Sequence, residues 1–242
     1  MLDQRVGADL QRQRIVKRMR WVVYGLGGLV LAAVLLSLLL VLPWRWLPPP
    51  TSSFMLQYWV SESTAPNHQW IRYEEIAPIM ALAVIAGEDQ RFPTHKGFDL
   101  HEIRQAISDY RAGRPLRGAS TISQQVAKNL YLWPGRSMPR KILEAWFTLL
   151  IEATWPKQRI LEVYLNIAQF SRHHFGVEAA SQYYFNKPAR ELTAKEAALL
   201  AAVLPAPVYY RIDQPSEQVR FRQGWILRQM NQLGGPAYLR NL

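Results

Sequence analysis

The chain has 242 residues, enough for one or two domains, and 49% hydrophobic with 19% charged residues is compatible with a globular core. The formal net charge of +11 at pH 7 favours an anionic partner, such as nucleic acid, anionic lipid or a pyrophosphate group. Cysteine is absent, which excludes disulfide bonds and thiolate chemistry but leaves the compartment open.

The N-terminal segment predicts a membrane anchor. No charged residue occurs over 21–44, and the apolar run 22–42 would form a helix of about 32 Å, long enough to cross a bilayer core. Six basic but only two acidic residues precede position 21, so the positive-inside rule places this tail in the cytoplasm. A cleaved signal peptide is disfavoured, because the apolar run is too long and no small-x-small cleavage site follows it. Aromatic residues suited to the membrane interfaces lie at both ends of the run: Trp21, Tyr24, Trp44 and Trp46.

These features divide the chain. We expect a basic cytoplasmic tail over 1–20, a transmembrane anchor over 21–44 and a stiff, proline-rich linker over 45–53. A domain over 54–242 would then lie outside the cytoplasm, which argues against nucleic acid as the partner. The apolar segment 54–60 fits either a core helix or a segment in the membrane interface, and hydrophobicity alone does not distinguish the two.

The region after the linker predicts a domain that is all-α or nearly so. Apolar residues recur at helical spacing, several runs follow helix-start signals, and no sustained alternation with period two occurs. Helices are predicted over 73–86, 98–112 and 120–131. Three further helices are predicted to begin near Ser137, Pro156 and Thr193, and the last predicted helix is amphipathic and covers 215–233.

Two adjacent carboxylates, Glu88 and Asp89, close the apolar run 79–86. Desolvation and like-charge repulsion both favour the protonated form of such a carboxyl group, so the pair is a candidate general acid or base. The alternative is that Asp89 merely caps a turn and that Glu88 is solvated.

The two carboxylates belong to the first of two long motifs. This motif is E-D-x-x-F-x-x-H-x-G-x-D over 88–99, and the second is G-x-S-T-I-x-Q-Q-x-x-K-N over 118–129. Together with R-K-I-L-E over 140–144 and E-V-Y-L-N over 162–166, their order and spacing resemble the family 51 glycosyltransferases across about 54–208. These enzymes polymerise lipid II into peptidoglycan, and the monofunctional biosynthetic transglycosylases of Gram-negative bacteria are the most similar group.

The resemblance implies a lysozyme-like helical fold of two lobes with a groove between them. It also implies the reaction: the 4-hydroxyl of an acceptor GlcNAc attacks the anomeric carbon of the donor, inverts it from α to β, and releases undecaprenyl pyrophosphate. A base must take the hydroxyl proton, and cations must stabilise the departing pyrophosphate.

The motifs supply candidates for these roles. Glu88 is the predicted base, and Glu144 is the second predicted catalytic carboxylate, which would orient a cation against the pyrophosphate. The i,i+4 spacing of Arg140 and Glu144 also fits a simple ion pair. The predicted substrate-binding residues are cations and polar side chains of the same motifs: Lys128, Arg117, Arg140, Lys141, Ser120, Thr121, Gln124, Gln125, Asp89 and His95.

Several of these residues also have structural interpretations. Asp89 and His95 are expected to shape the turn that carries Glu88, and Ser120 and Thr121 fit a helix N-cap. The run 162–166 is expected to hold its helix in place. The family often has Glu-Phe-Gly where this chain has Gln-Phe-Ser over 169–171, so a carboxylate is missing at position 169.

The remaining expectations concern ions, partners and place. No metal site built by the protein is predicted, because the five histidines follow no metal-binding pattern, but Mg²⁺ or Mn²⁺ bridging pyrophosphate oxygens is compatible with the resemblance. Lipid II, the growing glycan chain, membrane lipid and cell-division or cell-wall synthesis proteins are the expected partners. The expected location is the bacterial inner membrane, with the catalytic domain in the periplasm. A lytic glycan-cleaving enzyme and a non-catalytic cell-wall scaffold are the alternatives.

Overall fold

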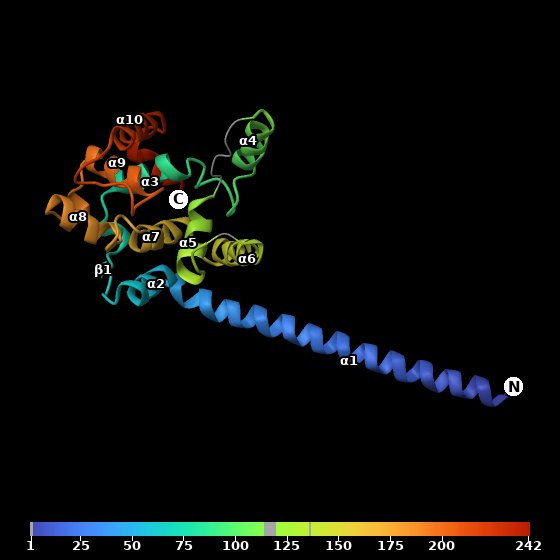
Figure 1. The fold of residues 1–242 in the computed structure, drawn as a ribbon. Coiled ribbons are helices and arrows are strands. Elements are labelled where there is room, and N and C mark those ends of the chain that lie inside the picture. Colours follow the sequence, from blue (N-terminus) through green and yellow to red (C-terminus); the bar gives the residue numbers. More distant parts are fainter. Residues whose placement is uncertain (1, 114–119, 136) are drawn as a thin grey trace. The chain divides into compact units, whose positions relative to one another are not determined.

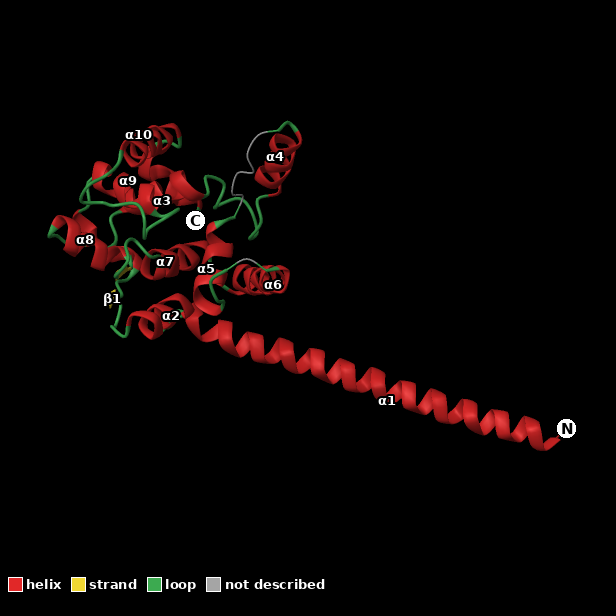
Figure 2. Ribbon diagram, in the orientation of Figure 1, coloured by secondary structure: helices red, strands yellow, loops and turns green. Residues whose placement is uncertain are grey.

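The computed structural model describes residues 2–113, 120–135 and 137–242, with side chains from residue 17 onward (Figures 1 and 2). The chain divides into two units, Met1–Trp44 and Arg45–Leu242, which are described separately below. The larger unit contains the positions of all the predicted site residues.

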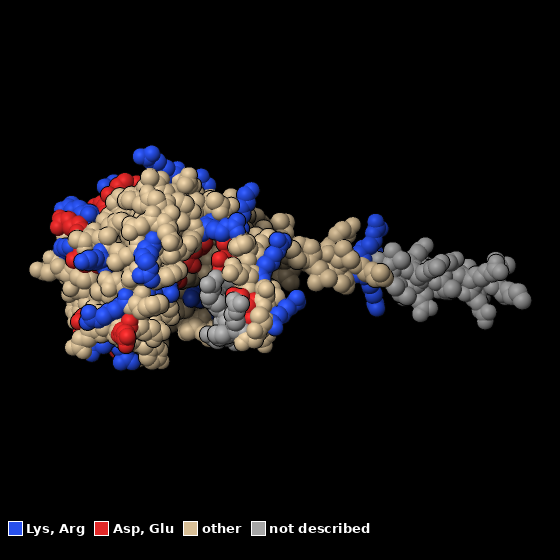
Figure 3. Space-filling model, turned by 90° about the horizontal axis from the view of Figure 1, so that it is seen from above, with Lys and Arg blue, Asp and Glu red and all other residues tan. Residues whose placement is uncertain are grey.

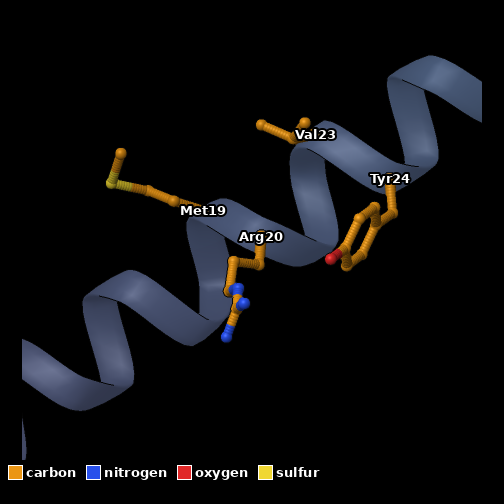
Figure 4. A pocket seen from close by; sticks show the side chains of 4 residues that line it. All are labelled: Met19, Arg20, Val23 and Tyr24. Atoms are coloured by element: carbon orange, nitrogen blue, oxygen red, sulfur yellow. The ribbon is translucent and has the colours of Figure 1, made fainter.

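The first unit is one long helix, α1 (Leu2–Val41), followed by the 3-10 helix η1 (Leu42–Arg45), whose last residue is the first of the second unit. Within its described part, Lys17–Arg45 is long and apolar enough to cross a membrane. Figure 4 shows the four side chains of α1 that line a shallow pocket, Met19, Arg20, Val23 and Tyr24. A single helix provides all four side chains, so this pocket encloses nothing and is not a candidate active site.

Among the described residues of the second unit, the regular secondary structure is almost entirely helical, which confirms the predicted fold class. Its two strands have two residues each and pair in parallel, β1 (Asn67–His68) with β2 (His174–Phe175). The α-helices are α2 (Ser53–Glu62), α3 (Pro78–Glu88), α4 (Leu100–Arg111), α5 (Ile122–Tyr131), α6 (Met138–Thr154), α7 (Lys157–Ile167), α8 (Val177–Phe185), α9 (Ala194–Val203) and α10 (Glu217–Gln232). The further 3-10 helices are η2 (Tyr73–Glu75), η3 (Ala189–Glu191) and η4 (Gly235–Asn241).

Two groups of packed helices form the core. The apolar helix α3 is buried over 80–86 and packs against α9, α10 and η4. Helix α5 packs against α6 and α7 and contacts α2 (Figure 1). Burial of α3 on nearly every side explains why its hydrophobic residues are not confined to one stripe. The C-terminal end of α3 meets the N-terminal end of α5, and the candidate site lies there.

The structure differs from the predicted elements at three places. The helix predicted over 73–86 is split into η2 and α3, because Pro78 lacks a backbone N–H and favours the first turn of a new helix. Helix α8 was not predicted; it starts after Gly176, whose φ of 83° is a conformation that glycine tolerates. The helix predicted over 215–233 is correct, but the chain then continues into η4.

Two predicted helices expose apolar residues. On α2, Met55 and Tyr58 are buried while Trp59 is exposed, so the core role of segment 54–60 is confirmed for one face only. Entry of the other face into lipid stays a prediction. On α4 the helical spacing is correct, but the large side chains Leu100 and Tyr110 are exposed, because this helix buries only Ala106.

Candidate active site

Glu88 is the last residue of α3, and both of its carboxylate oxygens have partners. Oε1 accepts a hydrogen bond from Arg222 Nη2 at 3.0 Å, and Oε2 accepts one from Gln125 Nε2 at 2.9 Å. The side-chain oxygen of Gln125, Oε1, in turn accepts a hydrogen bond from the hydroxyl of buried Tyr164 at 3.2 Å. Burial raises the pKa of Glu88, while Gln125, Arg222 and, through space, Lys128 oppose that rise.

Asp89 follows Glu88, and its hydrogen bonds stabilise the local structure. Its buried carboxylate accepts hydrogen bonds from the backbone N–H of Ile122 at 2.9 Å and from His95 Nε2 at 2.9 and 3.0 Å. His95 Nδ1 accepts from the N–H of Gly97 at 3.1 Å, so the Nε2 atom carries the proton that is donated to Asp89. This agrees with the turn-shaping role expected for both residues; their contact with substrate stays a prediction.

The start of α5 is closed by a capping box. Thr121 Oγ1 accepts from the N–H of Gln124 at 3.2 Å, and Gln124 Oε1 accepts from the N–H of Thr121 at 3.0 Å. The Thr121 hydroxyl also donates to the carbonyl of Gly97 at 2.6 Å. The predicted N-cap is therefore Thr121, while Ser120 is exposed one residue earlier. Arg117 lies outside the described residues.

Cations surround the second predicted carboxylate. Glu144 is buried on α6 and pairs with Arg140, whose Nη1 lies 3.2 Å from Oε2, and with the ammonium group of Lys141. The ion pair expected from the i,i+4 spacing is thus present, but it is buried rather than superficial. Such a pair compensates charges that would be costly to bury alone.

Lys128 of α5 connects the two carboxylates electrostatically. Burial lowers its pKa, and the negative charges of Glu144 and Glu88 oppose that fall. Its ammonium group lies 5.6 Å from the centre of the Phe54 ring. The structure therefore brings Glu88, Lys128, Arg140, Lys141 and Glu144 into one electrostatic neighbourhood. Lys and Arg are also abundant on the surface of the described chain (Figure 3).

Two guanidinium groups at this site have unused donors. Among the described side chains, Arg140 Nε and Arg222 Nε are buried and have no hydrogen-bond partner. A buried N–H without a partner is costly, so an anionic oxygen placed here would gain interactions that the protein alone does not satisfy. The site can thus provide a proton-accepting carboxylate beside donors for phosphate-like oxygens.

Sequence analysis missed Arg222. It lies 134 residues after Glu88 and on a helix that carries other arginines, so no local motif marks it. One signal was present: Arg222 is spaced by four from Ile226 and by eight from Met230, both of which are buried. A charged residue on the buried stripe of an amphipathic helix indicates a buried partner.

The segment predicted to hold its helix in place does so through Asn166. This fully buried side chain accepts from the N–H of Ile71 at 2.9 Å and donates to the carbonyl of Ile71 at 2.9 Å. Tyr164 supports Gln125, as described above. At the departure from the family pattern, Ser171 Oγ is hydrogen-bonded to His174 Nδ1 at 2.7 Å, and Gln169 donates to the carbonyl of Arg172.

Comparison with known proteins identifies the family of the chain. The family model described as Transglycosylase matches residues 56–231. A relative from Pseudomonas putida (strain KT2440), named biosynthetic peptidoglycan transglycosylase, is 48% identical over 95% of both chains. A relative of the same name from Klebsiella oxytoca is 56% identical over 80% of this chain and 83% of its own. Another, from Pectobacterium carotovorum subsp. carotovorum, is 54% identical over 83% of this chain and 85% of its own. The chain belongs to the transglycosylase family.

Proposed function

We propose that this protein is a peptidoglycan glycosyltransferase that polymerises lipid II into linear glycan strands. The single observation that carries the proposal is that Lys128 of α5 interacts through space both with Glu88 and with the charged cluster of Arg140, Lys141 and Glu144 on α6, in a member of the transglycosylase family. The products would be a β-1,4-linked glycan and undecaprenyl pyrophosphate, formed by inversion at the donor anomeric carbon.

Glu88 would act as the general base. As the acceptor 4-hydroxyl oxygen bonds to the anomeric carbon, its proton passes to a Glu88 oxygen, and the bond to pyrophosphate breaks with its electrons on the leaving group. A carboxylate whose pKa is raised by burial is a stronger base than an exposed one, yet it must still be ionised before the reaction. The partners of Glu88 oppose the effect of burial and so favour that ionised state.

Lys128, Arg140 and Lys141 would stabilise the pyrophosphate, whose charge is greatest as it departs. Glu144 would hold Arg140 and Lys141 in position through its two carboxylate oxygens. The unused Nε donor of Arg140 supports a contact with a phosphate oxygen. Ser120, Thr121, Gln124 and Gln125 would border the same substrate.

Incubation of the detergent-solubilised full chain with lipid II tests the proposal. The wild-type protein should form polymer, and Glu88→Gln should lose nearly all activity while retaining its helical circular dichroism. Glu191→Gln, at an exposed position, is the matched control and should remain active. Shortening of preformed glycan without polymer formation would favour a lytic enzyme, and inertness of the wild type in both assays would favour a scaffold.

We also propose that α1 anchors the protein in the bacterial inner membrane as a single span, with its N-terminus in the cytoplasm and the second unit in the periplasm. The length and apolar character of Lys17–Arg45 and the basic residues before it support this topology. A reporter that is active only in the periplasm should be active when fused after Leu242. Activity of a cytoplasmic reporter at that position would contradict the topology.

A divalent ion, if required, would arrive with the pyrophosphate rather than bind a cage in the protein. Within the described residues, no group of three or more His, Cys, Asp or Glu side chains could hold a metal ion. Both oxygens of Glu144 also face cations, which disfavours a further cation on that carboxylate. If an ion is required, chelation should lower turnover and added Mg²⁺ or Mn²⁺ should restore it, while calorimetry should detect no tight metal binding to the free protein.

A further inference from the structure

Arg222 is a long-range partner of the predicted base. From α10, its Nη2 atom donates to Glu88 Oε1 and to the carbonyl of Gly87, both at 3.0 Å. Helix α10 packs on both α3 and α9, so the guanidinium group projects from a fixed support. The Arg222 side chain is 30% exposed to solvent and the Glu88 side chain only 12%, so the contact is partly shielded from water.

The position of Glu88 explains why a cation is needed there. A carboxylate at the C-terminal end of a helix faces the negative end of the helix dipole, which disfavours its ionised form. Burial disfavours that form as well. Arg222 opposes both effects, because it places positive charge against the carboxylate and also satisfies a carbonyl in the last turn of α3.

The other groups around Glu88 do not replace this contact. Lys128 on α5 acts through space, and Gln125 on the same helix is an uncharged donor. Tyr164 on α7 donates its hydrogen bond to Gln125 and not to Glu88. Next to α3 and on the elements that pack against it, other titratable groups are engaged elsewhere: Asp89 with His95 and Ile122, Tyr238 of η4 with the carbonyl of Gln90, and Glu196 of α9 with Lys187.

We propose that Arg222 is a positioning residue for glycosyl transfer, one that holds the Glu88 carboxylate ionised and in a fixed orientation, ready to take the acceptor proton. The inference rests on the proposed function. A carboxylate has about four lone-pair sites, so hydrogen bonds from Arg222 and Gln125 leave sites free to receive that proton. Arg222 does not itself exchange a proton, because a guanidinium group stays protonated.

The test is the pH profile of lipid II polymerisation by the detergent-solubilised full chain. Arg222→Gln removes the charge, so Glu88 should protonate more readily and the acid limb of kcat should move to higher pH. On the acid side of the profile, we expect kcat to fall about tenfold, which corresponds to a displacement of one pH unit. On the plateau, we expect a smaller fall in kcat. Arg222→Lys keeps the charge and should retain the wild-type limb. Arg228→Gln, at an exposed position on the same helix, is the matched control.

The outcomes separate this inference from the proposed function. If the wild type polymerises lipid II and Arg222→Gln lowers the rate equally at every pH, Arg222 is only structural and the inference is overturned. If the wild type is inert, the titration of the Glu88 carboxyl group followed by ¹³C NMR still tests the inference. The Glu88 signal is assigned by its absence from the spectrum of Glu88→Gln. The midpoint of this titration should rise in Arg222→Gln, and an unchanged midpoint overturns the inference. Arg222→Met is the second neutral variant should Arg222→Gln fail to fold.

Discussion

The Asp89 carboxylate accepts a hydrogen bond from the backbone N–H of Ile122 over 2.9 Å, which joins the end of α3 to the start of α5. Glu88 and Gln125 lie on either side of this bond, one residue before Asp89 and three residues after Ile122. The carboxylate next to the predicted base thus fixes the distance between the two helices that provide the base and its amide partner.

Asp89→Ala should destabilise the protein more than it changes substrate affinity. The substitution leaves the N–H groups of Ile122 and His95 buried without an acceptor, which costs about 1–3 kcal/mol for each group left unsatisfied. Denaturant unfolding in detergent measures the loss. Asp213→Ala, at an exposed carboxylate, is the control and should change the midpoint little. An Asp89→Ala variant as stable as the wild type would mean that this bond does not support the site.

Local sequence signals predicted most helices correctly, because they depend on nearby residues. The Thr121 and Thr193 capping boxes and the Ser137 N-cap each satisfy N–H groups within one helical turn. Amphipathic spacing was a weaker guide to burial. Leu100 of α4 follows the helical period but is exposed, since periodicity shows which residues share a face and not whether another element covers it.

The candidate site was predicted in part, for a similar reason. The motifs identified Glu88, Lys128 and Glu144, and the structure brings the charges of these residues together. The partner Arg222 was missed, because its contact with Glu88 depends on the packing of α10 against α3 rather than on neighbouring residues. The burial of the pair Arg140 and Glu144 also depends on packing, so the i,i+4 spacing predicted the pair but not its shielding from water.

Gly97→Ala should lower both stability and activity. Gly97 has a φ of 87°, and a Cβ there would lie 2.8 Å from Thr148 Cγ2. Gly234 has the same φ of 87°, and no atom of the described residues lies within 4 Å of the position that a Cβ would take there. Gly234→Ala is therefore the control for the backbone strain, about 1–2 kcal/mol. The additional loss of stability in Gly97→Ala, relative to this control, measures the cost of the collision with Thr148. The double variant Gly97→Ala/Thr148→Ser removes the colliding methyl group and should recover part of it; no recovery would contradict this explanation.

Glu88→Gln should be more stable than the wild type at pH 8 and nearly equal to it at low pH. Burial raises the pKa of Glu88 above its unfolded value, so its favourable contribution is present when the carboxyl is protonated and is lost as the pH rises through the raised folded pKa. Glutamine resembles the protonated carboxyl and escapes that loss. Free energies of unfolding at pH 8 and at pH 4, which lies below the unfolded pKa of 4.5, measure the effect. A variant less stable than the wild type at pH 8 would show that the contact with Arg222 outweighs the cost of burial.

Glu144→Gln should move the alkaline limb of the activity profile to lower pH. Burial lowers the pKa of Lys128 and the Glu144 carboxylate opposes this, so removing that charge lowers the pKa of Lys128 further. A cation that stabilises pyrophosphate would then lose its proton, and its function, at a lower pH.

Glu144→Asp is the matched variant for this test, since it keeps the negative charge and should keep the alkaline limb of the wild type. Glu144→Gln should also cost roughly 3 kcal/mol of stability, because Arg140 remains buried after its charged partner is lost. Measuring kcat/KM against pH below the unfolding temperature of each variant separates the two effects. Equal displacement of the limb in both variants would mean that side-chain length, and not the charge on Glu144, controls Lys128.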